Sequence, residues 1–144
     1  MSGLCQTSLD DSEGRVMDSA ETNKAIVRRF LGAVAAGDID TIEELQAPDC
    51  TWWVVGRGEV SRKSYTDDVR GMLLAADPRK VEIIGMVAEG DMVAAEIRSE
   101  FHFGDRVYAN EYHDLFEIRA GQIVHGREYF DTGKVAAFFG PMEG

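Results

Sequence analysis

The C-terminal half of the chain most constrains the fold, because it reads as four consecutive β-strands. The strand-like segments cover residues 80–89, 91–103, 106–119 and 122–131, and apolar and polar side chains alternate along them. Turn sequences rich in Gly and Asp separate the segments. Connections this short join antiparallel neighbours, so the four segments predict an antiparallel meander.

Helices are predicted before this meander. Residues 20–36 place apolar side chains on one helical face, and Gly37 is a typical residue at which a helix ends. Asp38 is positioned as the N-cap of a second, short helix. Residues 50–55 (CTWWVV) predict a short strand.

A third helix is predicted from Ser64, which forms a capping-box pattern with Asp67, to about Ala76. A last short helix is predicted over residues 135–139. The element order is therefore ααβα followed by four antiparallel strands. This order predicts an α+β fold in which the N-terminal helices wrap one face of a curved, cone-shaped sheet.

Length and charge limit the remaining possibilities. The chain has 144 residues, which suits one domain, here expected over residues 19–144 after a disordered acidic tail at residues 1–18. A net charge of −11 disfavours nucleic acid and anionic membranes as partners. Because the sequence has no long apolar run, no signal-peptide pattern and only two cysteines, we expect a cytoplasmic protein.

Loop lengths fix the pairing of the last three strands. A two-residue loop at Gly104-Asp105 sets the first hairpin, and its inner-face pairs are Ala95–Asp114, Ile97–Tyr112, Ser99–Asn110 and Phe101–Tyr108. A three-residue loop, Ala120-Gly121-Gln122, sets the second, with the pairs Tyr112–Phe130, Asp114–Glu128, Phe116–Gly126 and Ile118–Val124. The two hairpins agree on one apolar, aromatic face, which we expect to lie beneath the helices.

Asp114 and Glu128 lie opposite each other on this apolar face. Two carboxyl groups with β-carbons roughly 5 Å apart cannot both ionise cheaply in an apolar site. We therefore expect one of them to hold a proton near neutral pH and the pair to titrate as a unit, with Gly126 and Ala95 leaving space beside it. Such a pair suits acid–base catalysis. The alternatives are a water-filled end of the cone, where both acids are solvated, and a one-residue bulge that turns part of the face outward.

Other residues of the same face are expected to contact a substrate. Tyr112 and Asn110 are positioned to donate hydrogen bonds to a substrate oxygen. The remaining predicted pocket residues are Ser99, Phe101, Phe130 and Trp53. Trp52 and Trp53 point to opposite faces. Trp53 or its neighbour is favoured for the pocket wall, which leaves open which of the two tryptophans lines it, and ordinary core packing is the alternative. Tyr65 either supplies a hydroxyl at the pocket rim or packs.

No metal or cofactor is expected. The three histidines lack metal-ligand spacing, and no phosphate-binding glycine motif or nucleophile elbow is present.

Two runs, GDIDTIEEL…DCTWWVVG and YHDLFEIRAGQIVHGREYFDT, resemble the nuclear transport factor 2-like superfamily. Within it, the sequence looks most similar to SnoaL-like polyketide cyclases and ketosteroid isomerase-related proteins, over about residues 20–140. The resemblance implies a cystatin-like α+β barrel, or cone, with a hydrophobic pocket open at one end. It also implies a homodimer formed through the outer sheet face.

The resemblance implies catalytic roles for only some positions of this sequence. Asp114 matches the protonated oxyanion-hole acid of ketosteroid isomerases. Their general base, however, falls at Val54 and their oxyanion tyrosine at Phe30, so isomerisation of that type is not implied. Glu128 matches a catalytic aspartate of SnoaL-like cyclases and limonene epoxide hydrolases, and Asp114 matches a histidine of the cyclases. The cyclases use that pair for proton transfer in an intramolecular aldol closure.

Epoxide hydrolases of this kind also need an Arg-x-Asp motif, which EIRSE resembles at Arg98 and Glu100. The register places both on the outer face, with Arg98 opposite Glu111, unless a bulge turns them inward.

Three functions therefore remain open. The first is a cofactor-independent acid–base enzyme, such as a cyclase or isomerase, that acts on a small hydrophobic oxygenated molecule, with Glu128 as base and Asp114 as acid. The second is a non-catalytic module that binds a hydrophobic ligand or assists a partner enzyme. The third is an epoxide hydrolase.

Overall fold

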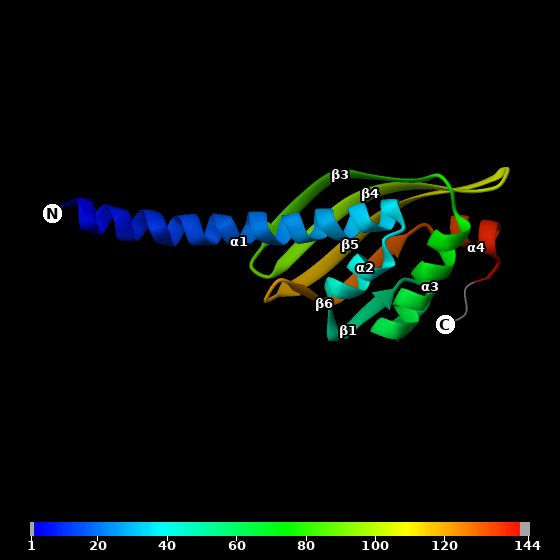
Figure 1. Ribbon diagram of the computed structural model, residues 1–144, viewed down its shortest axis with the longest axis horizontal. Helices are drawn as coiled ribbons and strands as arrows, with labels where there is room; N and C mark the ends of the chain where they lie inside the picture. The colour runs from blue at the N-terminus through cyan, green and yellow to red at the C-terminus, as the bar shows by residue number, and fades with distance from the viewer. Residues whose placement is uncertain (1, 142–144) are drawn as a thin grey trace.

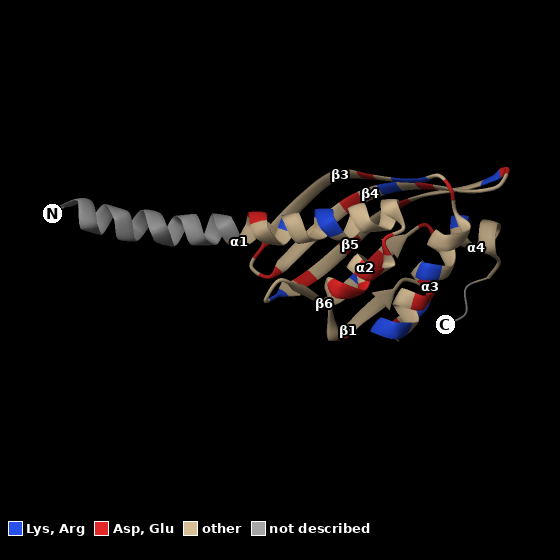
Figure 2. Ribbon diagram, in the orientation of Figure 1, with Lys and Arg blue, Asp and Glu red and all other residues tan. Residues whose placement is uncertain are grey.

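The structure, a computed structural model, describes the backbone of residues 2–141 and the side chains of residues 19–141, and Figure 2 colours the charged residues among the latter. The tail predicted at residues 1–18 lies outside the fully described residues, so that prediction is not tested. The elements in chain order are α1 (Ser2–Ala36), α2 (Ile39–Glu44), β1 (Gln46–Val54), β2 (Gly58–Ser61), α3 (Arg62–Ala75), β3 (Arg79–Glu89), β4 (Met92–Phe103), β5 (Arg106–Arg119), β6 (Gln122–Phe130) and α4 (Thr132–Phe139).

The strands form one curved sheet in the order β2-β1-β6-β5-β4-β3, and α1, α2 and α3 lie over one face of it (Figure 1). This confirms the α+β fold with helices on one face. The sheet is open, because β2 and β3 at its two edges do not pair. It is also mixed, since β1 runs parallel to β6. The four-residue strand β2 was not predicted, because it is too short to show a periodic pattern.

Apolar residues at helical spacing hold α1 on the sheet, and Val27, Phe30, Leu31 and Ala33 are all buried. Arg79 caps the C-terminal end of α1. Its guanidinium donates hydrogen bonds to backbone carbonyls at the C-terminal ends of both α1 and α3. One side chain thereby satisfies carbonyls that two helix ends leave without a partner.

Two predicted boundaries shift. The N-cap of α3 is Ser61 rather than Ser64: Ser61 has an extended backbone, and its Oγ accepts the backbone N–H of Ser64 at 3.1 Å. β1 begins at Gln46, before Pro48, rather than at the predicted Cys50. Pro48 is tolerated there because the pairing of β1 with β6 is irregular between Gln46 and Thr51. Asp38 caps α2 as predicted.

The register of β4 with β5 matches the prediction at every predicted pair. In the second hairpin, Asp114 lies opposite Glu128 as predicted, but Ile118 pairs with Ile123 rather than Val124. The loop has two residues, Ala120 (φ 51°) and Gly121 (φ 78°), and an irregularity next to Ile118 restores the predicted register further along. Ile123 therefore takes the buried position expected for Val124.

Candidate active site

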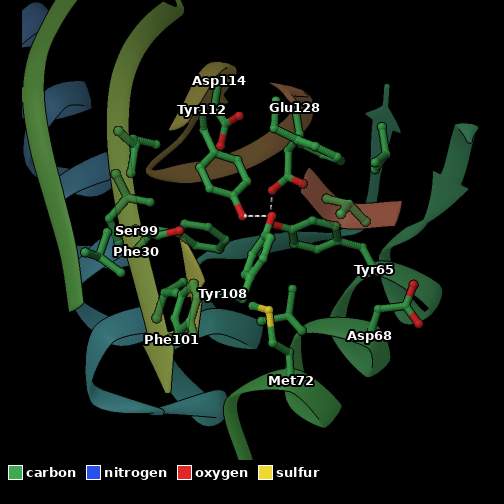
Figure 3. A pocket seen from close by; sticks show the side chains of 18 of the residues that line it. Phe30, Tyr65, Asp68, Met72, Ser99, Phe101, Tyr108, Tyr112, Asp114 and Glu128 are labelled. Carbon is green, nitrogen blue, oxygen red and sulfur yellow. Dashed lines mark hydrogen bonds between the residues drawn. The ribbon is translucent and has the colours of Figure 1, made fainter. Parts of the chain in front are cut away.

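A cavity of about 250 Å³ lies between the helices and the inner face of the sheet. Apolar side chains from α1, α3 and the sheet form most of its wall (Figure 3). Its polar lining includes Ser99, Tyr108, Tyr112, Asp114, Glu128 and Tyr65. The one lysine or arginine among the lining residues is Arg57, which is already in an ion pair with Asp68. The cavity thus suits a small, largely apolar molecule.

Asp114 and Glu128 face each other across neighbouring strands in the wall of this cavity. β6 is hydrogen-bonded on both sides, to β5 and to β1, which holds the backbone of Glu128 in place. Glu128 Oε1 accepts a hydrogen bond of 2.7 Å from the Tyr65 hydroxyl (Figure 3). Asp114 is 4% exposed, and its Oδ1 has no hydrogen-bond partner among the described residues.

Burial shifts the titration of both acids. Burial, and then the charge of Glu128, raise the pKa of Asp114 well above its ordinary value, while the backbone N–H of Tyr129 lowers it less. Burial raises the pKa of Glu128 to about 7, against the lowering effect of the Tyr65 hydrogen bond. These directions favour the protonated form of Asp114 and bring the titration of Glu128 close to neutral pH, which is what the pairing of an acid with a base requires.

The Tyr65 hydroxyl is held in place by the core. The ring of Tyr65 stacks on the buried indole of Trp52 at a centroid distance of 4.0 Å and an angle of 8°. Trp52 Nε1 donates to Gln46 Oε1 at 2.9 Å, and Gln46 Nε2 donates to Thr66 Oγ1 at 3.0 Å. Tyr65 therefore both packs and supplies a hydroxyl, and the sequence had left these two roles as alternatives.

Three residues of β5 form a second hydrogen-bonded chain. The Tyr108 and Tyr112 hydroxyls are 2.8 Å apart, and Asn110 Nδ2 donates to the Tyr108 hydroxyl, also at 2.8 Å. Burial raises the pKa of both tyrosines, so both stay protonated. Tyr108 was not among the predicted site residues, although its inward position opposite Phe101 could have identified it.

Trp53 does not line the cavity, contrary to the prediction. It lies on the other face of the sheet, where the Arg127 guanidinium carbon is 4.1 Å from its ring centroid. Trp52 is the inward residue of the pair, because β1 places it opposite Gly126. A Cβ on Gly126 would lie 2.1 Å from Trp52 Cζ3, so the space expected beside the acids is filled by the indole.

Asn110 is also not a cavity residue. It is buried, and its Nδ2 donates hydrogen bonds to the backbone oxygen of Asp131 and to the Tyr108 hydroxyl. The amide donors of Asn110 therefore already have partners inside the protein, and Asn110 does not line the cavity. The other predicted pocket residues do line the cavity, and they are Ser99, Phe101, Tyr112 and Phe130.

The arginine–acid constellation of epoxide hydrolases is not assembled in the cavity. Arg98 and Glu100 do not line it, and Arg98 forms exposed ion pairs with Glu111 at 3.4 Å and Glu82 at 3.7 Å. This is the outward orientation that the register predicted.

The histidine, cysteine and acidic side chains in the described part of the chain include no group of three or more that could hold a metal ion. None of its helices is both long and apolar enough to cross a membrane.

The comparison with known families identifies the chain. The sequence profile of the SnoaL-like domain family matches residues 27–126. The chain belongs to this family. No curated protein sequence matches it.

Solved structures share the fold at low sequence identity. The proposed hydroxylase AclR from Streptomyces galilaeus is 18% identical with a TM-score of 0.73, and the match covers 84% of this chain and 97% of AclR. An LEH-like epoxide hydrolase from M. tuberculosis is 24% identical with a TM-score of 0.71, covering 85% and 90%. Wild-type IdmH, a proposed polyketide cyclase from Streptomyces antibioticus, is 18% identical with a TM-score of 0.71, covering 82% and 98%.

Proposed function

We propose that this SnoaL-like protein is a cofactor-independent acid–base enzyme that transfers a proton on a small, hydrophobic, oxygenated molecule. The observation that carries the proposal is the buried pair of Asp114 and Glu128, which lines an apolar cavity. Among the described residues, no lysine or arginine lowers the pKa of either acid. An uncompensated pair of this kind costs stability, and groups of this kind occur most often at functional sites.

The two acids have different roles in this proposal. Glu128, with a pKa of about 7, is the base that removes a proton from carbon. Asp114 keeps its own proton and acts as the acid. Proton removal beside a carbonyl would allow either isomerisation or ring closure, so both remain within the proposal. One protein of similar fold, IdmH, is described as a proposed polyketide cyclase, and ring closure of that kind lies within this range.

Hydrogen–deuterium exchange at carbon tests this proposal. Cyclic ketones and β-keto esters are incubated with the protein in heavy water, and loss of the proton signal is followed by NMR. We expect exchange with the wild type and a rate roughly 100-fold or more lower with Glu128→Gln, because general-base catalysis typically contributes at least that factor. Glu96→Gln is the matched control, since Glu96 is an exposed strand residue that does not line the cavity.

Two outcomes would contradict the proposal. If the wild type binds members of the panel but exchanges none, the protein is better described as a ligand-binding module. If Glu128→Gln and Glu96→Gln both exchange at the wild-type rate, the acid pair is not the catalytic group.

A dimer formed through the outer sheet face also remains a proposal. The residues that would meet there include Tyr129, which is 41% exposed, and Trp53. Sedimentation equilibrium should give twice the monomer mass for the wild type and the monomer mass for Tyr129→Glu. A wild-type protein that sediments as a monomer would rule this interface out.

A further inference from the structure

The Ser99 hydroxyl is a buried polar group without a partner. Ser99 is 4% exposed, lines the cavity, and its Oγ has no hydrogen-bond partner among the described residues. Its neighbours on the same wall are apolar, with Val81 opposite it on β3 and Ile97 and Phe101 on either side along β4. A hydroxyl left unpaired in such a place costs stability, and a ligand in the cavity would supply the missing partner.

The Tyr112 hydroxyl is oriented by the chain that leads to it. The amide of Asn110 has a fixed orientation, because its Oδ1 accepts the Glu111 backbone N–H at 2.8 Å and its Nδ2 donates to the backbone oxygen of Asp131. The Tyr108 oxygen accepts from the same Nδ2, and it shares a second hydrogen bond with the Tyr112 oxygen in which either hydroxyl can be the donor. A ligand oxygen that accepts from Tyr112 selects the arrangement in which Tyr108 donates to Tyr112.

These two hydroxyls lie on the same face and approach each other. Ser99 pairs with Asn110, and Tyr112 is two residues further along β5, which makes Ser99 and Tyr112 diagonal neighbours. Figure 3 shows both hydroxyls at the cavity, with the Glu128 carboxyl on the far side of the Tyr112 hydroxyl from Ser99. No hydrogen bond joins the two hydroxyls, although Ser99 lies close enough to Tyr112 to oppose the rise that burial causes in the pKa of Tyr112.

We propose that the hydroxyls of Ser99 and Tyr112 together bind one carbonyl oxygen of the substrate, with the carbon next to that carbonyl placed at Glu128. The substrate class is then a ketone or ester, and Tyr108 and Asn110 are positioning residues. This inference rests on the proposed proton transfer, and it adds a binding site for the oxygen that the acid pair does not provide.

The chemistry balances without a further reactant. The Glu128 carboxylate takes a proton from the carbon beside the carbonyl, and the electron pair of that C–H bond forms a carbon–carbon double bond. The carbonyl π electrons move to the oxygen, which becomes an enolate oxygen held by the two hydroxyl donors. Return of the proton from Glu128 to carbon completes an exchange or isomerisation. In a ring closure, the enolate carbon attacks a second carbonyl, the π electrons of that carbonyl move to its oxygen, and this oxygen takes the proton from Glu128.

Infrared spectroscopy of a bound ketone tests the inference without requiring turnover. Cyclohexanone labelled with carbon-13 at its carbonyl is bound to the full-length protein, and its carbonyl stretch is measured. Hydrogen bonds to the oxygen lower this frequency, so we expect the lowest value with the wild type and a higher value with Ser99→Ala. Loss of one neutral hydrogen bond should also weaken binding roughly 3- to 10-fold.

Tyr65→Phe is the matched control, because it also removes a hydroxyl from the cavity wall, but one that is bonded to Glu128. The carbonyl frequency should stay at its wild-type value in this variant. Ser99→Ala should unfold at the wild-type temperature or above, since it removes an unpaired buried group. The inference is overturned if Ser99→Ala leaves the frequency unchanged, if Tyr65→Phe raises it as much, or if the wild type binds no ketone.

The two proposals can fail separately. A Ser99-dependent frequency without any proton exchange would leave the oxygen-binding site in place and refute the acid–base function. Proton exchange that depends on Glu128, together with a carbonyl frequency that Ser99→Ala does not change, would support the acid–base function and refute the oxygen-binding site.

Discussion

At the scale of single residues, the Tyr65 hydroxyl affects the pKa of Glu128, the proposed base. Its hydrogen bond to Glu128 stabilises the ionised carboxylate and so lowers the pKa of Glu128. Removing it with Tyr65→Phe should raise that pKa above about 7. In the pH profile of deuterium exchange, the rise in rate should then move to higher pH, by roughly half to one pH unit.

Tyr129→Phe is the control for this prediction, because Tyr129 lies on the outer face and its hydroxyl bonds to Arg127 instead. The account of Tyr65 is wrong if the pH profile of Tyr65→Phe overlays that of the wild type, or if Tyr129→Phe moves it equally.

Residue-level prediction from the sequence succeeded where strand alternation decides orientation. Asp114 and Glu128 were placed opposite each other because side chains of a strand alternate between its faces, and the structure has that pairing. Asn110 was placed on the correct face, but its bond to the backbone oxygen of Asp131 depends on how α4 begins. The role of Tyr65 could not be settled, since the position of a helix over a sheet is not contained in its own periodicity.

At the scale of secondary-structure elements, the contact between β1 and β6 depends on a glycine. Trp52 lies over Gly126, and a Cβ there would be 2.1 Å from the indole. Gly126→Ala should therefore displace Trp52 and the Tyr65 ring stacked on it, and we expect roughly 2–3 kcal/mol less stability in urea unfolding. Exchange activity should also fall, because Tyr65 loses its position at Glu128.

Gly85→Ala on β3 provides the comparison, because a Cβ at Gly85 would meet no atom within 4 Å. Its stability should stay close to that of the wild type. Equal losses in the two variants would show that strand conformation, and not the Trp52 contact, explains the effect.

Element-level prediction depended on the strength of local signals. The long strands and their hairpins were correct, because alternation and turn residues specify them together. The second hairpin was predicted with a loop one residue too long and without its bulge, and these two errors cancel before Asp114. Trp53 was misplaced because β1 pairs in parallel with a distant strand, and local sequence does not determine that contact.

For the whole molecule, the acid pair should make stability fall as pH rises. Asp114 and Glu128 have ordinary pKa values of 3.8 and 4.5, and both are raised in the folded state. The folded protein then binds more protons than the unfolded chain above those ordinary values. The stabilisation is complete below about pH 4 and is lost as pH rises through the folded pKa values, by on the order of 3 kcal/mol for Glu128 alone.

Thermal unfolding from pH 4 to pH 8 measures this loss. Asp114→Asn should show a shallower decline than the wild type and a higher Tm at pH 8, because the amide has no proton to lose. Glu96→Gln removes an exposed acid and should keep the wild-type slope. A wild-type Tm that is flat or rising across this range, after correction with Glu96→Gln, would argue against a buried, protonated pair.

The central claim is that Asp114 and Glu128 share one proton near neutral pH, and carboxyl carbon-13 NMR tests it most directly. Aspartate and glutamate carboxyls are labelled, the two signals are assigned with Asp114→Asn and Glu128→Gln, and both are followed through a pH titration. We expect Glu128 to titrate near pH 7 while Asp114 stays protonated beyond it. If both signals instead titrate between about pH 4 and 5, at the ordinary carboxyl values, the two acids are solvated and the acid–base account of this site is wrong.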